Sequence, residues 1–430
     1  MTDFFDALES RRPEAREAAL MSALPAHIAH AQRCTSAFAE SLAGVDAATI
    51  TSRAALARLP VLRKHELLER QQALRARDAF GGFSAIGWRH GQALRAPMQR
   101  ARRVFQSPGP IYEPEGMAGD YWRMGRAIHA AGFRDGDLAH CSFSYHLTPA
   151  GAMMEAGAHA VGCTTFAGGI GNTELQLQAV ADLRPQGYIG TPSFLKIMVD
   201  KAAETGVNIS SITKGMVGGE AFPPSLRDWL RERGIEVYQS YATADAGLIA
   251  YETSQRQGLV LDEAVILEIV RPGTGDPVPE PAAGAAPEVG EVVVTVLNPG
   301  YPLLRLGTGD LSAMLPGPCP SGRTNARIRG WLGRADQTTK VRGMFVHASQ
   351  VAELIRRHPE LARARLVIEG EMAQDRMTLR AEVSLSPEGL VPAVINSIRD
   401  ITKLRAEVEL VAPGTLPNDG KVIDDARSYA

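Results

Sequence analysis

The chain has 430 residues, more than the roughly 250–300 at which a single hydrophobic core usually stops growing, so we expect two folding units. Its 46 Lys and Arg residues nearly balance 48 Asp and Glu residues, which argues against partners that need an overall field, namely nucleic acid and anionic membranes. With 45% hydrophobic and 22% charged residues, the composition excludes a disordered or fibrous chain.

The cysteines and the N-terminal segment indicate the compartment. Cys34, Cys141, Cys163 and Cys319 are scattered, without a CxxC pair, which is typical of a reducing environment and predicts no structural zinc. The N-terminal segment has no signal-peptide core, and no apolar run long enough to span a membrane follows it. We therefore expect a cytoplasmic protein.

Residues 1–75 are rich in Ala, Leu, Arg and Glu, with apolar residues three and four positions apart. This spacing predicts a lead-in of amphipathic helices, broken near Pro60. From about Leu138, short apolar runs alternate with helical stretches. That alternation favours βαβ units around a mostly parallel sheet.

Two of these units can be read from local signals. Residues 187–190 form a short strand, Thr191-Pro192-Ser193 then caps a helix, and Gly206 stops it. The next unit has strands at 216–217 and 235–238, with a helix between them that Pro223-Pro224 opens and Gly234 ends.

The C-terminal third changes architecture after Gly333. Before that point, apolar runs predict strands at 291–297 and 303–306. After it, we expect helices at 349–357 and 391–404 and strands at 365–369, 377–383 and 407–411. The pattern predicts a large α/β domain over residues 1–333 and a small α+β domain over residues 334–430.

Four short segments carry polar residues in an order that suggests chemistry. They are SYATAD, with Tyr241, Thr243 and Asp245; PLLRLGTGDL, with Arg305 and Thr308-Gly309-Asp310; GRADQTTKVRG, with Arg334 and Asp336; and LPNDGKVID, with Lys421. Together they resemble the phenylacetate-CoA ligase branch of the adenylate-forming (acyl-CoA synthetase, AMP-dependent ligase) superfamily, and the resemblance covers nearly the whole chain. It implies a large N-terminal adenylation domain and a small mobile C-terminal domain.

The resemblance assigns roles in the first segment. Tyr241 would stack near adenine, Thr243 would meet a phosphate, and Asp245 would help to hold Mg²⁺ in place of the family's Glu. A carboxylate suits a hard cation, although Asp reaches less far and stands one place later than the family pattern puts it. Taken alone, a Tyr and an Asp after a strand are more often part of a turn.

The later segments receive roles in the same way. Asp310 would accept hydrogen bonds from the ribose, and the alternative is a plain Gly-Asp hairpin turn. Arg334 would contact the nucleotide and Asp336 would be the hinge of the small domain, or both would belong to a solvated basic turn. The ammonium of Lys421 would stabilise the charge of the adenylation transition state, whereas a lone C-terminal lysine is usually surface.

Weaker matches complete the implied site. The backbone of Gly219, Glu220 and Ala221 would line the adenine site, or would be an ordinary turn. Tyr145 and His146 fall where the family builds its acyl pocket, and a packed aromatic pair is an equal alternative. Cys319 stands alone where some relatives have metal-binding cysteines, so we expect no zinc.

The phosphate loop departs from the family. The family pattern is roughly Ser-Ser-Gly-Thr-Thr-Gly-Lys-Pro, whereas residues 107–114 read SPGPIYEP, so that only Ser107, Gly109 and Pro114 agree. The two new prolines have no N–H to donate to a phosphate, and Glu113 replaces the lysine. We interpret this segment as a degenerate phosphate loop.

Three functions remain open from the sequence. The first is an AMP-forming acid-CoA ligase that uses ATP, Mg²⁺ and CoA to activate a small aryl or acyl carboxylate through an acyl-adenylate. The second is an ATP-independent homologue that binds or processes an already activated acyl group, and the third is a non-catalytic homologue. A homodimer is possible in each case.

Overall fold

A computed structural model describes residues 4–88, 99–272, 274–279, 287–335, 337, 339–370, 374–417 and 421–427 of the chain. The chain divides into two compact units, one formed by Met1–Gly219 with Leu230–Trp331 and the other by Glu220–Trp229 with Leu332–Ala430. The boundary that the sequence predicts between an adenylation domain, residues 1–333, and a C-terminal domain, residues 334–430, stays a prediction. Each unit is described by itself below.

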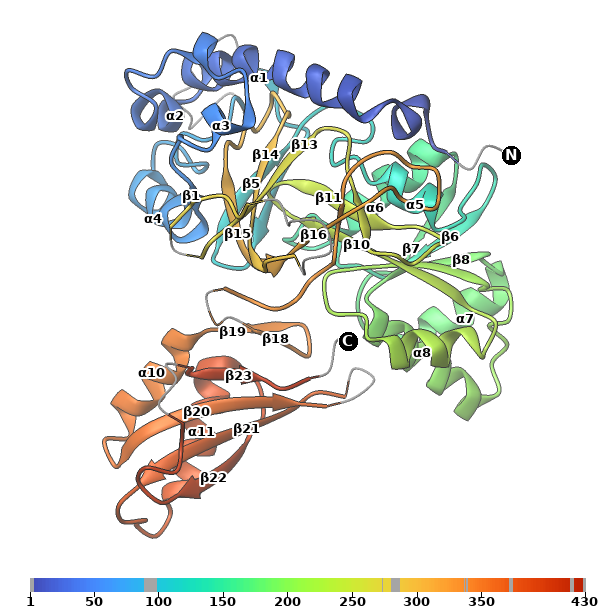
Figure 1. Ribbon diagram of the computed structural model, residues 1–430. Helices are drawn as coiled ribbons and strands as arrows, with labels where there is room; N and C mark the ends of the chain where they lie inside the picture. Colours follow the sequence, from blue (N-terminus) through green and yellow to red (C-terminus); the bar gives the residue numbers. More distant parts are fainter. Residues whose placement is uncertain are drawn as a thin grey trace. The chain divides into compact units, whose positions relative to one another are not determined.

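The lead-in is helical, as expected. Its elements are η1 (Ala7–Ser10), α1 (Pro13–Cys34), α2 (Ser36–Ser41), η2 (Ala47–Thr49), α3 (Arg53–Leu56) and α4 (Lys64–Leu74). Helix α1 buries Leu24 and Ile28 completely, and the Thr35 hydroxyl caps α2 by accepting the N–H of Phe38 at 3.3 Å. In Figure 1 these blue helices lie beside the first sheet.

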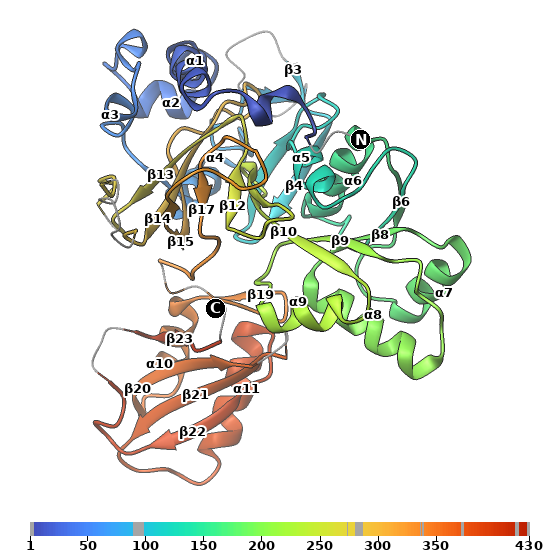
Figure 2. The ribbon, with the colours of Figure 1, turned by 45° about the vertical axis from the view of Figure 1, so that its right-hand side comes forward.

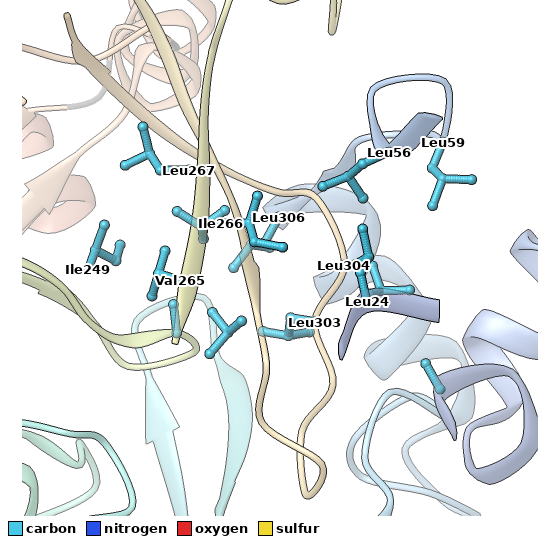
Figure 3. Packing of buried hydrophobic residues seen from close by; sticks show 14 of the residues in the cluster. Leu24, Leu56, Leu59, Ile249, Val265, Ile266, Leu267, Leu303, Leu304 and Leu306 are labelled. Atoms are coloured by element: carbon cyan, nitrogen blue, oxygen red, sulfur yellow. The ribbon is translucent and has the colours of Figure 1, made fainter. Parts of the chain in front are cut away.

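That sheet has four strands in the order β1-β15-β14-β13. They are β1 (Leu62–Arg63), β15 (Leu306–Ser312), β14 (Gly290–Val296) and β13 (Val265–Val270); β1 pairs with β15 in parallel and the other pairs are antiparallel. Leu24 and Leu56 from the helices pack with Ile266 and Leu306 from the strands in one hydrophobic core (Figure 3).

The strand expected at 303–306 begins only at Leu306, because Arg305 interrupts it. Arg305 has a left-handed φ of 44° and its side chain is buried. The guanidinium makes two bonds of 2.9 Å to Glu268 of β13 and also donates to the carbonyls of Ala57, Leu59 and Gly275. Arg305 therefore ties the lead-in to the sheet.

The second sheet has nine strands in the order β16-β17-β12-β11-β10-β9-β8-β6-β7. The parallel half contains β6 (Leu138–Cys141), β7 (Thr164–Ala167), β8 (Gly187–Gly190), β9 (Lys214–Val217) and β10 (Glu236–Thr243). The antiparallel half contains β11 (Gly247–Glu252), β12 (Leu259–Leu261), β16 (Met314–Leu315) and β17 (Arg327–Ile328). The expected mostly parallel sheet is thus parallel only as far as β10.

The helices of this region are α5 (Gly125–Ala130), α6 (Ala150–Val161), α7 (Thr173–Leu183) and α8 (Pro192–Thr205). Figure 2 shows α7 and α8 beside β8 and β9. The predicted start and end of α8 are confirmed. The Thr191 hydroxyl caps the helix by accepting the N–H of Phe194, and Gly206 ends the helix with a φ of 73°.

Two short ribbons complete the larger unit. Strands β2 (Ile86–Gly87) and β3 (Gln99–Arg100) pair in parallel. Strands β4 (Arg103–Ser107) and β5 (Ile111–Glu115) form an antiparallel hairpin, so the degenerate phosphate loop is the turn and second strand of a ribbon.

The smaller unit has a sheet in the order β22-β21-β20-β23, a two-stranded ribbon and helices. Its elements are the first six residues of α9 (Pro224–Arg231), β18 (Thr339–Val341), β19 (Met344–Val346), α10 (Ala348–Arg357), β20 (Leu361–Glu369), β21 (Arg376–Val383), α11 (Leu390–Thr402), β22 (Glu407–Val411) and β23 (Ile423–Asp425). An α/β unit and a smaller α+β unit confirm the expected fold class.

Candidate functional site

The altered phosphate loop turns its acidic residue inward. The carboxyl of Glu113 is buried, accepts the N–H of Ser107 at 3.3 Å and is also hydrogen-bonded by the Ser107 hydroxyl. Burial, together with the neighbouring carboxylate of Asp245, raises the pKa of Glu113 well above its ordinary 4.5. The protonated, uncharged form of Glu113 is therefore favoured.

Asp245 lies in the turn between β10 and β11, and its carboxylate is paired with a lysine. The Nζ atom of Lys64 lies 2.7 Å from Oδ2 of Asp245, whose side chain is only 1% exposed. The buried Oδ1 atom has no hydrogen-bond partner among the described residues. Asp245 thus offers one oxygen to a further ligand.

Lys64 was missed by sequence reasoning. It is the first residue of α4, directly after β1, and the pairing of β1 with β15 sets the position of this helix start. One signal was available, because a cation in the first turn of a helix opposes the helix dipole and needs a compensating anion. The anion is 181 residues away along the chain, so no local pattern identifies it.

A second group surrounds Asp310, which lies within β15 and not in a free turn. The hydroxyl of Tyr241 donates to Oδ2 of Asp310 at 2.8 Å and lies 3.1 Å from Oγ1 of Thr308. The indole N–H of Trp331, which sequence reasoning also missed, donates to Oδ1 at 3.0 Å. Each carboxylate oxygen can accept more than one hydrogen bond, so Asp310 can still accept ribose hydroxyls.

Thr243 ends β10, and its hydroxyl accepts the N–H of Ala246 at 3.1 Å across the turn that carries Asp245. The register of β10 against β11 shifts between Tyr241 and Ala242. The first two expected segments thus converge: Thr243 ends β10, Asp245 lies in the turn that follows, and Tyr241 of the same strand is bonded to Asp310.

The remaining expected nucleotide-binding residues are distributed between the units. Gly219 ends the first stretch of the larger unit, with a φ of 79°, whereas Glu220, Ala221, Arg334 and Lys421 belong to the smaller unit. Their roles stay predictions. The expected hinge, Asp336, lies outside the described residues.

Tyr145 and His146 differ in their surroundings. Tyr145 is partly buried against the core that includes Met153, and burial raises the pKa of its hydroxyl. His146 is exposed, in a turn where its N–H donates to the Ser144 hydroxyl at 3.1 Å. Of the pair, only Tyr145 packs as a pocket wall would.

Other features lie apart from these groups. A cavity of about 440 Å³ shares none of the residues above; it is lined by Asn172, Thr173, Glu174, Leu175, Ile197 and Lys201. Within the described ranges, no three His, Cys, Asp or Glu side chains gather as a metal site, and the expectation about zinc stays a prediction. No helix in those ranges is long and apolar enough to cross a membrane.

Comparisons with known proteins find similar sequences among AMP-binding enzymes. The model of the AMP-binding enzyme family matches residues 124–297. The chain is 28% identical over 362 residues to a phenylacetate-coenzyme A ligase of Aromatoleum evansii, covering 81% of this chain and 76% of that one. It is 27% identical over 412 residues to a phenylacetate-coenzyme A ligase of Thermus thermophilus, covering 87% of each.

Solved structures agree on the fold. The crystal structure of a 2-hydroxyisobutyryl-CoA ligase with 2-HIB-AMP and CoA covers all of this chain with a TM-score of 0.80 at 22% identity, over 93% of that chain. An amide bond synthetase of Marinactinospora thermotolerans covers 78% of this chain and 73% of its own, with a TM-score of 0.53 at 18% identity.

Proposed function

Because the chain is a phenylacetate-CoA ligase-like member of the adenylate-forming superfamily, we propose that it is an AMP-forming acid-CoA ligase for a small aryl or acyl carboxylate. In the first step a carboxylate oxygen attacks the α-phosphorus of ATP, and the bond to the β-phosphate breaks to release pyrophosphate. In the second step the CoA sulfur attacks the acyl carbonyl, the thiol proton is lost, and AMP leaves.

The observation that carries this proposal is the Lys64–Asp245 pair. The loop has lost the family's lysine, but the ammonium of Lys64 lies 2.7 Å from Asp245, and its charge also acts on Glu113. A preorganised cation next to the phosphates stabilises the charge that develops during adenylation. Lys64 therefore compensates for the missing loop lysine, and a protonated Glu113 adds no opposing charge.

The residues also fit a magnesium ion. The buried Oδ1 of Asp245 is a hard oxygen donor without a hydrogen-bond partner among the described residues, which is the kind of ligand that Mg²⁺ accepts together with phosphate oxygens. When bound, Mg²⁺ would neutralise phosphate charge. Asp245 would hold the ion, and Lys64 would remain on its other oxygen.

Acid-dependent exchange of radiolabelled pyrophosphate into ATP tests the first step. With Mg²⁺ and a panel of aryl and aliphatic acids, we expect exchange with at least one acid and none without acid. If no acid supports exchange while the protein is folded, adenylation from ATP is rejected.

One observation favours a second candidate, an ATP-independent homologue that takes an acyl-adenylate or acyl-CoA. The N–H and the hydroxyl of Ser107, which the family loop would offer to a phosphate, both donate hydrogen bonds to the carboxyl of Glu113. This candidate predicts that AMP or a non-hydrolysable acyl-adenylate binds in calorimetry with little affinity for ATP. Tight ATP binding would reject it.

The remaining assignments are part of the proposal. The partners would be a small carboxylic acid and CoA, and the comparisons support an acid and CoA as the substrate classes. A cytoplasmic location, a homodimer and the lack of a nucleic-acid partner stay predictions.

A further inference from the structure

Helix α4, which begins with Lys64, also contacts the phosphate loop near its other end. Gln71 lies two helical turns after Lys64, so the two side chains lie on the same face of α4. Leu67, between them on that face, packs in the hydrophobic core, and Gln71 is fully buried. The buried face of α4 thus carries a cation at its start and an amide near its end.

The amide of Gln71 pairs with the backbone of Tyr112 in both directions. Its Nε2 donates to the Tyr112 carbonyl at 2.9 Å, and its Oε1 accepts the Tyr112 N–H at 2.8 Å. Tyr112 lies in β5, whose other edge pairs with β4 in a two-stranded ribbon. The amide therefore takes the place of a neighbouring strand on the outer edge of this ribbon.

Two further contacts hold the end of α4 in place. Arg75, directly after the helix, donates to the Pro110 carbonyl at 3.3 Å, and its guanidinium carbon lies 5.3 Å from the centre of the Tyr112 ring. The chain at Gly81 packs so closely against the helix that a Cβ there would lie 2.9 Å from the backbone nitrogen of Gln71. Both the backbone and the side chain of Gln71 are thus fixed.

These contacts determine how far the loop lies from Lys64. Glu113 follows Tyr112 directly, accepts the N–H of Ser107 at 3.3 Å, and is acted on by the charge of Lys64. Lys64 and Gln71 belong to one helix. The ribbon and the ammonium therefore cannot move apart unless α4 bends or the bonds between Gln71 and Tyr112 break.

We propose that Gln71 is a positioning residue, which holds the degenerate phosphate loop at the distance from Lys64 that the phosphates of ATP require. The loop lacks the family's lysine, so its cation comes from a different element, and that element must be fixed against the loop. The inference rests on the proposed function, in which Lys64 acts on ATP. Gln71 acts through Lys64 and the loop, and not through a contact with the nucleotide.

A comparison of ATP with AMP separates this role from a merely structural one. Gln71→Met keeps the length of the side chain but removes both hydrogen bonds to Tyr112. We expect the Kd for ATP with Mg²⁺ to rise about 10-fold and kcat/KM for ATP in pyrophosphate exchange to fall about 10- to 100-fold, within the loss that a misplacement of about 1 Å can cause. The Kd for AMP should not change, because AMP lacks the β- and γ-phosphates. Thioester formation from a synthetic acyl-adenylate and CoA should keep its wild-type rate.

Gln72→Met is the matched control. Gln72 is the neighbouring glutamine of the same helix, and its side chain is exposed. Both affinities and both half-reactions should equal those of the wild type in this variant. Gln71→Met introduced into Lys64→Met should cause little further loss of exchange, because Gln71 acts through that lysine.

The outcomes separate the inference from the proposed function. Equal weakening of ATP and AMP binding in Gln71→Met, or an unchanged Kd for ATP in the folded variant, would overturn the positioning role. If Gln71→Met does not fold, Gln71→Asn, whose amide is one methylene shorter, replaces it and must show the same selective loss of ATP binding. A wild-type protein that supports no pyrophosphate exchange with any acid would instead reject the proposed function, and the inference with it.

Discussion

At the scale of the residue, the proposed adenylation from ATP rests on Lys64. We predict that Lys64→Met lowers kcat/KM for ATP in pyrophosphate exchange by about 100-fold, the order of loss seen when one preorganised electrostatic contact is removed. The reason is that the ammonium beside Asp245 is lost while the loop offers no replacement.

The control for Lys64 is another Lys–Asp pair of similar length. Lys196 lies 2.6 Å from Asp200 on α8, and Lys196→Met should leave exchange unchanged. Equal activity of Lys64→Met and wild type would show that the cation comes from elsewhere.

Glu113 gives the protein a pH dependence. Its raised pKa means that the folded protein binds this proton more tightly than the unfolded chain does, so the stability it confers is present below about pH 4.5 and is lost as the pH rises toward the folded-state pKa. In Glu113→Gln the amide side chain has nearly the same shape as the protonated carboxyl, and it stays uncharged at every pH. We expect its unfolding midpoint to rise relative to wild type as the pH increases from 5 to 8.

Glu174→Gln, which changes an exposed glutamate, is the control for this pH series. Its midpoint should follow the wild type throughout. A difference between Glu113→Gln and wild type that stays constant with pH would mean that Glu113 is ionised in the folded protein.

At the scale of the elements, Arg305 holds the lead-in on the sheet. Replacing one partner of a buried ion pair leaves the other charge uncompensated, so Arg305→Met should destabilise the protein by about 3–5 kcal/mol in denaturant unfolding. The pair of Arg271 and Glu288 is about half exposed, and Arg271→Met should not change the unfolding midpoint. Similar midpoints for both variants would contradict this account of Arg305.

Elements with local signals could be predicted from the sequence, and contacts between distant segments could not. Strand 187–190, the capped helix after it and strand 407–411 were predicted with the bounds that the structure has, or within a few residues. The expected strand at 303–306 was wrong because an apolar run does not reveal the left-handed backbone of Arg305. The antiparallel half of the large sheet includes the pairing of β12 with β17, two strands that lie far apart in the sequence, so no local pattern predicts it.

The candidate site was predictable where a motif supplies the residue. Tyr241 and Asp310 were both expected, and their hydrogen bond joins two motifs 69 residues apart. Lys64 and Trp331 belong to no motif and enter the site only through folding. Glu113 was identified in the place of the family's lysine, but its burial and its bonds to Ser107 were not predictable from the loop sequence.

At the scale of the whole molecule, we predict that the smaller unit contributes Lys421 to adenylation, as the larger unit contributes Lys64. Lys421→Ala is expected to lower pyrophosphate exchange by about 100-fold or more, because a cation that stabilises the transition state is lost. The same variant should convert a synthetic acyl-adenylate and CoA to acyl-CoA at nearly the wild-type rate. Loss of both activities together would contradict a role confined to adenylation.

The central claim is that this chain adenylates an acid from ATP although its phosphate loop is degenerate. The most direct measurement incubates the wild-type protein with ATP, Mg²⁺, CoA and a panel of aryl and acyl acids, and quantifies AMP and acyl-CoA by chromatography. We predict equal amounts of AMP and acyl-CoA with at least one acid, and neither product without an acid. Folded protein that yields no AMP with any acid, while binding AMP or an acyl-adenylate, would contradict the claim.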